Sequence, residues 1–191
     1  MNAFADTTLI VLGAGLSTRF GSDKLSSDFC GRPLATHLLV ATAPFRFAQK
    51  ILIARGQPWT ADFAAAGYDI VTNSTPERGQ SSSLKLGLAR ATAQNVLVML
   101  ADMPLVSTEH LRGIENVFMA RDGTPVASFD EERRCPPAMF RRSQIALARL
   151  EGDSGARELL AQAAIVQGRL GELSDVDSLA DLAALQVLNK P

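Results

Sequence analysis

Short runs of branched apolar residues recur along the chain, each bounded by glycine, proline or polar residues. The clearest runs cover residues 8–12, 50–54, 69–72 and 95–101, and the last is the most continuously apolar segment of the chain. Uninterrupted runs of this length are typical of strands buried on both faces of a parallel sheet. The pattern therefore predicts at least four strands, with residues 95–101 at the centre.

Between these runs, apolar residues return every three or four positions, as one face of a helix requires. Helices are predicted over residues 33–44, 59–66, from 81 onward, 107–120, 143–150, 154–163 and 179–187. Further strands are predicted over 124–129, 138–140 and near Val166, with an arginine-rich turn over 133–137. This alternation of strands and helices predicts a three-layer α/β fold with helices on both faces of the sheet.

Composition favours an ordinary globular protein, and we expect a single domain over residues 1–191. The chain is 47% hydrophobic and 20% charged, and its 19 basic and 20 acidic residues leave a net charge of −1. Proteins that bind nucleic acid or membrane surfaces in general carry a large basic excess, which is missing here. An anionic ligand must therefore be bound by a local cluster of cations.

The two cysteines, Cys30 and Cys135, form no CxxC pair and have no histidine at metal-ligand spacing. The first residues lack the charged start and apolar centre of a signal peptide, and no run approaches the roughly 20 apolar residues of a membrane span. From these features we expect a cytoplasmic protein.

A glycine-rich turn follows the first strand and carries two cations. It reads Gly13-Ala14-Gly15-Leu16-Ser17-Thr18-Arg19-Phe20-Gly21-Ser22-Asp23-Lys24. Glycines let the backbone approach a ligand and expose its N–H groups, so the turn suits an anion such as a nucleoside triphosphate. It lacks the last glycine of the dinucleotide fingerprint and the GxxxxGK(S/T) spacing of a P-loop, and it is not a nucleophile elbow.

Asp102 follows the central strand, in the segment Leu100-Ala101-Asp102-Met103-Pro104. Ligands of open parallel sheets bind beyond the carboxyl ends of the strands, so Asp102 and the glycine turn should line one crevice. A carboxylate that faces triphosphate oxygens is a suitable Mg²⁺ ligand, although an aspartate there can also cap a turn.

These motifs resemble the MobA-like nucleotidyltransferase family, and within it the cytidylyltransferases that mature the molybdenum cofactor. Residues 12–24 match LxxGxSxRMGxxK with Phe20 in place of methionine, and residues 100–104 reproduce LADMP. Residues 79–84 resemble GMxxSL, residues 152–157 resemble GDxGAR, and residues 175–182 resemble DIDTPEDL. The resemblance covers residues 8–185 in the expected order.

The resemblance implies a Rossmann-like nucleotidyltransferase fold with a mostly parallel sheet, and transfer of CMP from CTP to the phosphate of molybdopterin, with release of pyrophosphate. It implies nucleotide binding by Leu12, Gly13, Ala14, Gly15, Ser17, Arg19, Lys24, Ser81 and Ser82. Arg19 would hold the departing phosphates and Lys24 the α-phosphate, with Asp102 as the third catalytic residue. Mg²⁺ would be bound by Asp102 with Asp175 or Asp177, the other of the two serving as a helix cap. The acceptor would contact Pro137, Asp153 and Arg157.

The acceptor remains the most open point, because the family's GHPVLF segment reads Cys135-Pro136-Pro137-Ala138-Met139-Phe140 here. The arginines Arg133, Arg134, Arg141 and Arg142 either form a plain basic surface or hold the acceptor's phosphate. Other hypotheses are GMP transfer from GTP, cytidylyl transfer to a sugar- or polyol-phosphate, and a non-catalytic nucleotide-binding protein that delivers the cofactor to a molybdoenzyme or its chaperone.

Overall fold

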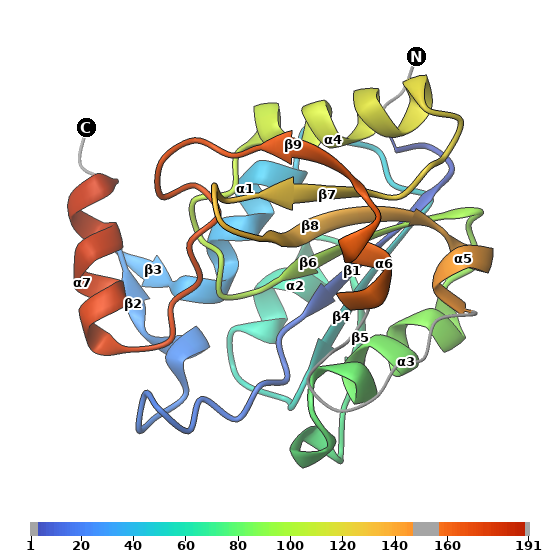
Figure 1. Ribbon diagram of the computed structural model, residues 1–191. Helices are drawn as coiled ribbons and strands as arrows, with labels where there is room; N and C mark the ends of the chain where they lie inside the picture. The colour runs from blue at the N-terminus through green and yellow to red at the C-terminus, as the bar shows by residue number, and fades with distance from the viewer. Residues whose placement is uncertain (1–3, 147–156, 190–191) are drawn as a thin grey trace.

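The computed structural model describes residues 4–146 and 157–189, arranged around one large twisted sheet (Figure 1). Its strands are β1 (Thr7–Leu12), β4 (Gln49–Ala54), β5 (Asp69–Thr72), β6 (Asn95–Leu100), β7 (Val126–Phe129), β8 (Arg134–Arg141) and β9 (Ala164–Gln167). A separate two-stranded sheet is formed by β2 (Asp28–Phe29) and β3 (Arg32–Pro33).

The described α-helices are α1 (Leu38–Thr42), α2 (Thr60–Ala65), α3 (Gln80–Arg90), α4 (Thr108–Ala120), α5 (Arg142–Ala146), α6 (Arg157–Ala161) and α7 (Leu179–Leu188). Short 3₁₀ turns are η1 (Lys24–Ser26), η2 (Leu34–His37) and η3 (Pro76–Arg78). None of these helices is both long enough and apolar enough to cross a membrane.

The large sheet has the strand order β5-β4-β1-β6-β8-β7-β9. Strands β5, β4, β1 and β6 are parallel neighbours, β8 runs antiparallel to both β6 and β7, and β9 is parallel to β7. This arrangement confirms the predicted α/β fold with a mostly parallel sheet and with residues 95–100 near the middle.

Alternate side chains of the central strands enter two separate hydrophobic layers. In β1, Leu9 and Val11 join the layer covered by α1, α2, α4 and α7, whereas Ile10 and Leu12 face α3, α5 and α6 (Figure 1). Helix α3 lies so close to the sheet that a Cβ on Gly87 would sit 2.7 Å from Ile10 Cγ2. A residue without a side chain is therefore required at position 87.

The segment predicted as an arginine-rich turn is mostly strand, because β8 begins at Arg134. Cys135 pairs with Ser128 and Ala138 with Ala127, so Pro136 and Pro137 stand in a bulge between these pairs. Proline has no N–H to donate to the ladder, and a bulge accommodates such residues inside a strand. The prediction missed this strand because two prolines in sequence are typical of turns.

The helix predicted over 33–44 is shorter than expected. Pro33 has an extended backbone, with ψ of 135°, and belongs to β3, while the helical part begins as η2 and continues as α1. The helices predicted over 143–150 and 154–163 correspond to α5 and α6 only in part, since residues 147–156 lie outside the described residues.

Tyr68 is buried in the hydrophobic core, and its titration tests that burial directly. Its hydroxyl lies 2.9 Å from Thr42 Oγ1, and burial raises the pKa of Tyr68 to about 12 despite that hydrogen bond. The phenol is the chain's single tyrosine, so its near-ultraviolet absorbance can be followed without overlap from others.

We expect the phenolate of Tyr68 to form with a midpoint near pH 12 in the folded protein and about pH 10 in denaturant. Because the folded pKa is the higher one, this group's contribution to stability is complete below about pH 10 and is lost as the pH rises toward 12. Tyr68→Phe is the control that removes the absorbance change. A midpoint near 10 in the native protein would contradict the described burial.

Candidate functional site

Two adjoining cavities open at the carboxyl edge of the parallel strands. The first, which we name the polar cleft, has a volume of about 530 Å³ and is lined by the glycine turn, Lys24, Asp102, Asp175 and Asp177. The second, named the apolar pocket, has a volume of about 580 Å³. Five residues line both cavities: Leu12, Gln80, Leu100, Arg133 and Asp175.

The glycine turn is anchored to the sheet where it leaves β1. Gly13 N donates to Ile53 O at 2.8 Å, and a Cβ on Gly13 would lie only 3.0 Å from the Trp59 ring and 3.2 Å from Ala101 Cβ. Ser17 adopts a left-handed backbone with φ of 53°, and its buried hydroxyl has no hydrogen-bond partner among the described residues. The turn thus lines the polar cleft and holds an unsatisfied hydroxyl just beneath its surface.

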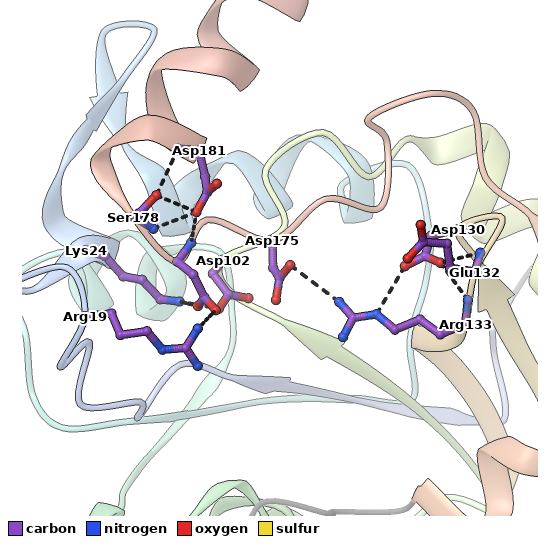
Figure 2. Close-up of polar contacts among 10 residues, drawn as sticks. Arg19, Lys24, Asp102, Asp130, Glu132, Arg133, Asp175, Ser178 and Asp181 are labelled. Atoms are coloured by element: carbon purple, nitrogen blue, oxygen red, sulfur yellow. Dashed lines mark hydrogen bonds and ion pairs between the residues drawn. The ribbon is translucent and has the colours of Figure 1, made fainter.

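Lys24 lies at the centre of a charged cluster in the polar cleft (Figure 2). Its Nζ is 2.8 Å from Asp102 Oδ2 and 2.9 Å from Asp177 Oδ1, while Arg19 Nη1 is 2.9 Å from Asp177 Oδ2. The Lys24 side chain is 10% exposed and that of Arg19 is 80% exposed. One cation is therefore fixed deep in the cleft, and the other reaches in from the surface.

The acidic segment 174–177 is held at the cleft by Val176, which stands between its two aspartates. Val176 is fully buried in the core, and its N–H donates to the carbonyl oxygen of Asp102 at 3.0 Å. Its neighbours Asp175 and Asp177 both line the polar cleft as a result. We predicted that one of these aspartates caps α7, and this is wrong, because Ser178 is the N-cap and forms a capping box with Asp181.

Burial and charge act against each other on the central pair. Burial alone lowers the pKa of Lys24, but the carboxylates of Asp102 and Asp177 outweigh it, so the pKa lies above its ordinary value. Burial raises the pKa of Asp102, and the Lys24 ammonium opposes this only in part. The charge on Asp175 raises the pKa of Asp102 further, which indicates that the two carboxyl groups are near each other.

The serines predicted to contact the base stand at the start of α3, where Ser82 is hydrogen-bonded to its neighbours. Ser82 Oγ donates to Gly79 O at 2.8 Å, and Asn73 Nδ2 donates to both Ser82 Oγ and Ser83 Oγ at 2.9 Å. Ser81 is buried, and Gln80 and Ser83 line the polar cleft instead. Asn73 follows β5 directly, as Asp102 follows β6, so it also stands at the carboxyl end of a parallel strand.

The residues predicted for the acceptor are placed only in part. Pro137 is buried, and its carbonyl oxygen accepts from Ser128 Oγ at 2.7 Å, while its neighbours Cys135, Pro136 and Ala138 line the apolar pocket. Arg157 is the first residue of α6, but its side chain lies outside the description, as does all of Asp153.

A divalent cation fits the donors of the polar cleft. Asp102 Oδ1 is buried and has no hydrogen-bond partner among the described residues, while Asp102 Oδ2 binds Lys24. Within residues 4–146 and 157–189, no three histidine, cysteine or acidic side chains gather as a complete metal site. The unpaired oxygen of Asp102 suits Mg²⁺ or Mn²⁺, because these ions take one or two protein carboxylates and complete their shell with phosphate oxygens and water.

Comparison with known proteins agrees with this geometry. Residues 9–167 match the family described as MobA-like NTP transferase domain. The purine catabolism protein PucB of Bacillus subtilis is 27% identical over 188 residues, covering 88% of this chain and 90% of that protein. A probable molybdenum cofactor guanylyltransferase of Thermococcus sibiricus is 26% identical over 115 residues, which are 57% of this chain and 54% of that protein.

Solved structures share the fold over almost the whole chain. Rv0371c from Mycobacterium tuberculosis superposes with a TM-score of 0.78 and 29% identity, covering 95% of this chain and 98% of that one. A second structure of Rv0371c, in complex with manganese, has a TM-score of 0.73 and 26% identity, with the same coverage of 95% and 98%.

Proposed function

This chain belongs to the MobA-like NTP transferase family, and we propose that it transfers CMP from CTP to the phosphate of molybdopterin. Nucleotidyl transfer is the family's chemistry, whereas the choice of base and acceptor is the proposal. The observation that supports nucleotidyl transfer is the convergence of Arg19, Lys24, Asp102 and Asp177 in the cleft that the glycine turn lines, while the choice of CTP and molybdopterin rests on the resemblance of the motifs.

The reaction requires little beyond charge neutralisation and alignment. An oxygen of the acceptor phosphate attacks the α-phosphorus of the triphosphate, a new O–P bond forms, and the bond to the β-phosphate breaks with release of pyrophosphate. The attacking phosphate is already ionised at neutral pH, so no general base is needed. In this proposal Lys24 stabilises the α-phosphate and Arg19 the departing phosphates.

Asp177 forms ion pairs with both Arg19 and Lys24. In the proposed reaction the triphosphate would replace Asp177 on these two cations. The exposed Arg19–Asp177 pair contributes little to stability, since exposed ion pairs are typically worth about 0–1 kcal/mol. A triphosphate carries more charge than one carboxylate and can replace it. The N–H groups of residues 14–17 and the hydroxyl of Ser17 would then bind phosphate oxygens, whereas the N–H of Gly13 stays bonded to Ile53 O and only shapes the turn.

Mg²⁺ would be held by Asp102, through its unpaired Oδ1, together with Asp175. Asp175 is preferred over Asp177 because its charge raises the pKa of Asp102, and because its ion pair with Arg133 is long, at 3.7 Å. The bound metal would neutralise charge on the phosphates. The manganese complex of Rv0371c supports a divalent ion in a protein of this fold.

We propose that residues 1–191 act as one domain in the cytoplasm, where the free thiols Cys30 and Cys135 stay reduced. The product would pass to a molybdoenzyme or its chaperone.

Pyrophosphate release tests the function directly. With purified protein, Mg²⁺ and molybdopterin, we expect release from CTP, slower release from GTP, and none without the acceptor. Preference for GTP would overturn the cytidylyl assignment, and turnover with a sugar- or polyol-phosphate in place of molybdopterin would overturn the acceptor. If no triphosphate is cleaved with any of these acceptors, the catalytic hypothesis fails and the accessory-protein hypothesis replaces it.

A further inference from the structure

Arg133 lies at the boundary between the polar cleft and the apolar pocket, and it lines both. It enters from the side opposite Arg19 and Lys24, with Asp102 and Asp175 between them (Figure 2). We propose that Arg133 binds the phosphate of the acceptor and thereby selects phosphorylated ring compounds for the apolar pocket. This inference rests on the proposed function, since it names the acceptor side of the same site.

The apolar pocket has the volume and the lining of a site for an organic ring system. Its side chains are mainly apolar and include Leu84, Val98, Met103, Phe140 and Leu173. Polar groups gather at the rim that it shares with the polar cleft, where Gln80, Arg133 and Asp175 stand. A ligand with an apolar body and one anionic end would therefore place that end beside Arg133.

Among the described residues, the cations that line the polar cleft are Arg19, Lys24 and Arg133. The arginines that follow Arg133 do not line it, although Arg134 lines the apolar pocket. Arg134 Nε donates to Ala163 O at 3.0 Å, Arg142 Nε donates to Ala93 O at 3.1 Å, and Arg141 Nη2 binds Asp122. Since Arg19 and Lys24 are assigned to the triphosphate, Arg133 is the described cation of the cleft that is left for the second phosphate.

The base of the Arg133 side chain is fixed, while its outer end is loosely paired. Asp130 accepts from the Arg133 N–H at 2.9 Å and from Arg133 Nε at 3.3 Å, and so holds the turn and the guanidinium together. At the other end, Arg133 Nη2 is 3.7 Å from Asp175 Oδ1, longer than a hydrogen bond. The two Nη groups can therefore turn to a phosphate without breaking a strong contact.

Binding of the acceptor phosphate by the Arg133 guanidinium would also orient that phosphate toward the triphosphate. The planar guanidinium binds two phosphate oxygens at once, which leaves another oxygen directed at the α-phosphorus across the shared boundary of the two cavities. Asp175 adjoins this boundary, so a phosphate that replaces it on Arg133 releases that carboxylate into the polar cleft.

Binding of a fluorescent pterin tests the inference without relying on turnover. Arg133→Gln should weaken the affinity for a phosphorylated pterin at least about tenfold, since hydrogen bonds to charged groups are worth about 1.5–3 kcal/mol. The same pterin without its phosphate should bind wild type and Arg133→Gln with equal, low affinity. Affinity for CTP should change less than about twofold, and Arg133→Lys should restore part of the lost affinity because it returns a point charge without the fork.

Arg141→Ala is the matched control, because it removes the arginine at the far end of β8, the strand that Arg133 precedes, and should leave pterin affinity unchanged. Equal affinity of wild type and Arg133→Gln for the phosphorylated pterin, or no binding by wild type, would overturn the role of Arg133. Failure of the proposed function is seen separately, as absence of pyrophosphate release by wild type.

Discussion

Replacing Lys24 with alanine is expected to slow nucleotidyl transfer by at least about tenfold, and by up to about a thousandfold. Removal of one preorganised donor from a developing charge typically costs about 10² to 10³ in rate. Lys24 is the deepest cation of the polar cleft, 10% exposed and held by two carboxylates, so it is preorganised in this sense. Neither water nor Arg19 at the surface can reproduce a charge fixed at that depth.

The same substitution removes the cationic partner of a largely buried carboxylate. Asp102 is 18% exposed, and breaking a buried pair on one side costs about 3–5 kcal/mol. We expect a smaller loss, of about 1–3 kcal/mol in the free energy of unfolding, because the site opens into the cleft and Asp102 can take up a proton. Lys24→Arg keeps the charge and should fold as wild type does, which separates lost catalysis from lost stability.

Rates of pyrophosphate release at saturating CTP and acceptor, with denaturant unfolding of each variant, measure both effects. Lys85→Ala removes an exposed lysine of α3 and should change neither quantity. A normal rate in folded Lys24→Ala would refute the role assigned to Lys24.

Asp102→Asn should lower the rate by at least about a hundredfold, the largest loss expected from a change of so few atoms. The amide oxygen can still accept a hydrogen bond from Lys24, but the negative charge that would hold the divalent cation is lost. Charge stabilisation by a bound metal is worth several kcal/mol, which corresponds to at least about two powers of ten in rate.

Stability should change much less than activity. Burial raises the pKa of Asp102, so a neutral amide removes a charge that the folded protein tolerates poorly. The same change takes one of two carboxylate partners from the buried Lys24 ammonium, which keeps Asp177 at 2.9 Å, so the two effects on the free energy of unfolding oppose each other.

Binding of Mn²⁺ in the presence of CTP, followed by electron paramagnetic resonance, gives a readout that does not depend on turnover. We expect Asp102→Asn to weaken it at least about tenfold, as outer-sphere changes at metal sites already cost about 10–100-fold. Asp62→Asn, on the exposed face of α2, is the matched control. Unchanged Mn²⁺ affinity would remove Asp102 from the metal site.

The fold was largely readable because the central strands β1 and β6 are buried on both faces, whereas β5 lies at the edge of the sheet and is mostly exposed. Strands β1, β4, β5 and β6 are short apolar runs that begin and end within a residue of the predicted bounds. Strand β8 was missed in its first half because Pro136 and Pro137 have no N–H to donate, and only the bulge opposite Ala127 and Ser128 lets them remain in the sheet. Local sequence does not contain that partner strand.

The site was readable where its residues follow a strand. The glycine turn and Asp102 both sit at carboxyl strand ends, and the structure brings them together as the strand-end rule requires. The serine-rich start of α3 does not by itself show what its hydroxyls bind, because they are as well suited to a buried asparagine as to a base. Asn73 takes the hydroxyl of Ser82, and that contact spans 9 positions.

By itself, the sequence determined the layered sheet, the glycine turn at the end of β1 and the carboxylate at the end of β6, because each depends on residues adjacent in the chain. Only the tertiary structure decided how distant charges pair. Lys24 meets Asp177 across 153 positions, and Arg133, not its neighbours, reaches the boundary of the two cavities. These pairings depend on Val176, which is buried in the core and hydrogen-bonded to Asp102, a contact that no local pattern encodes.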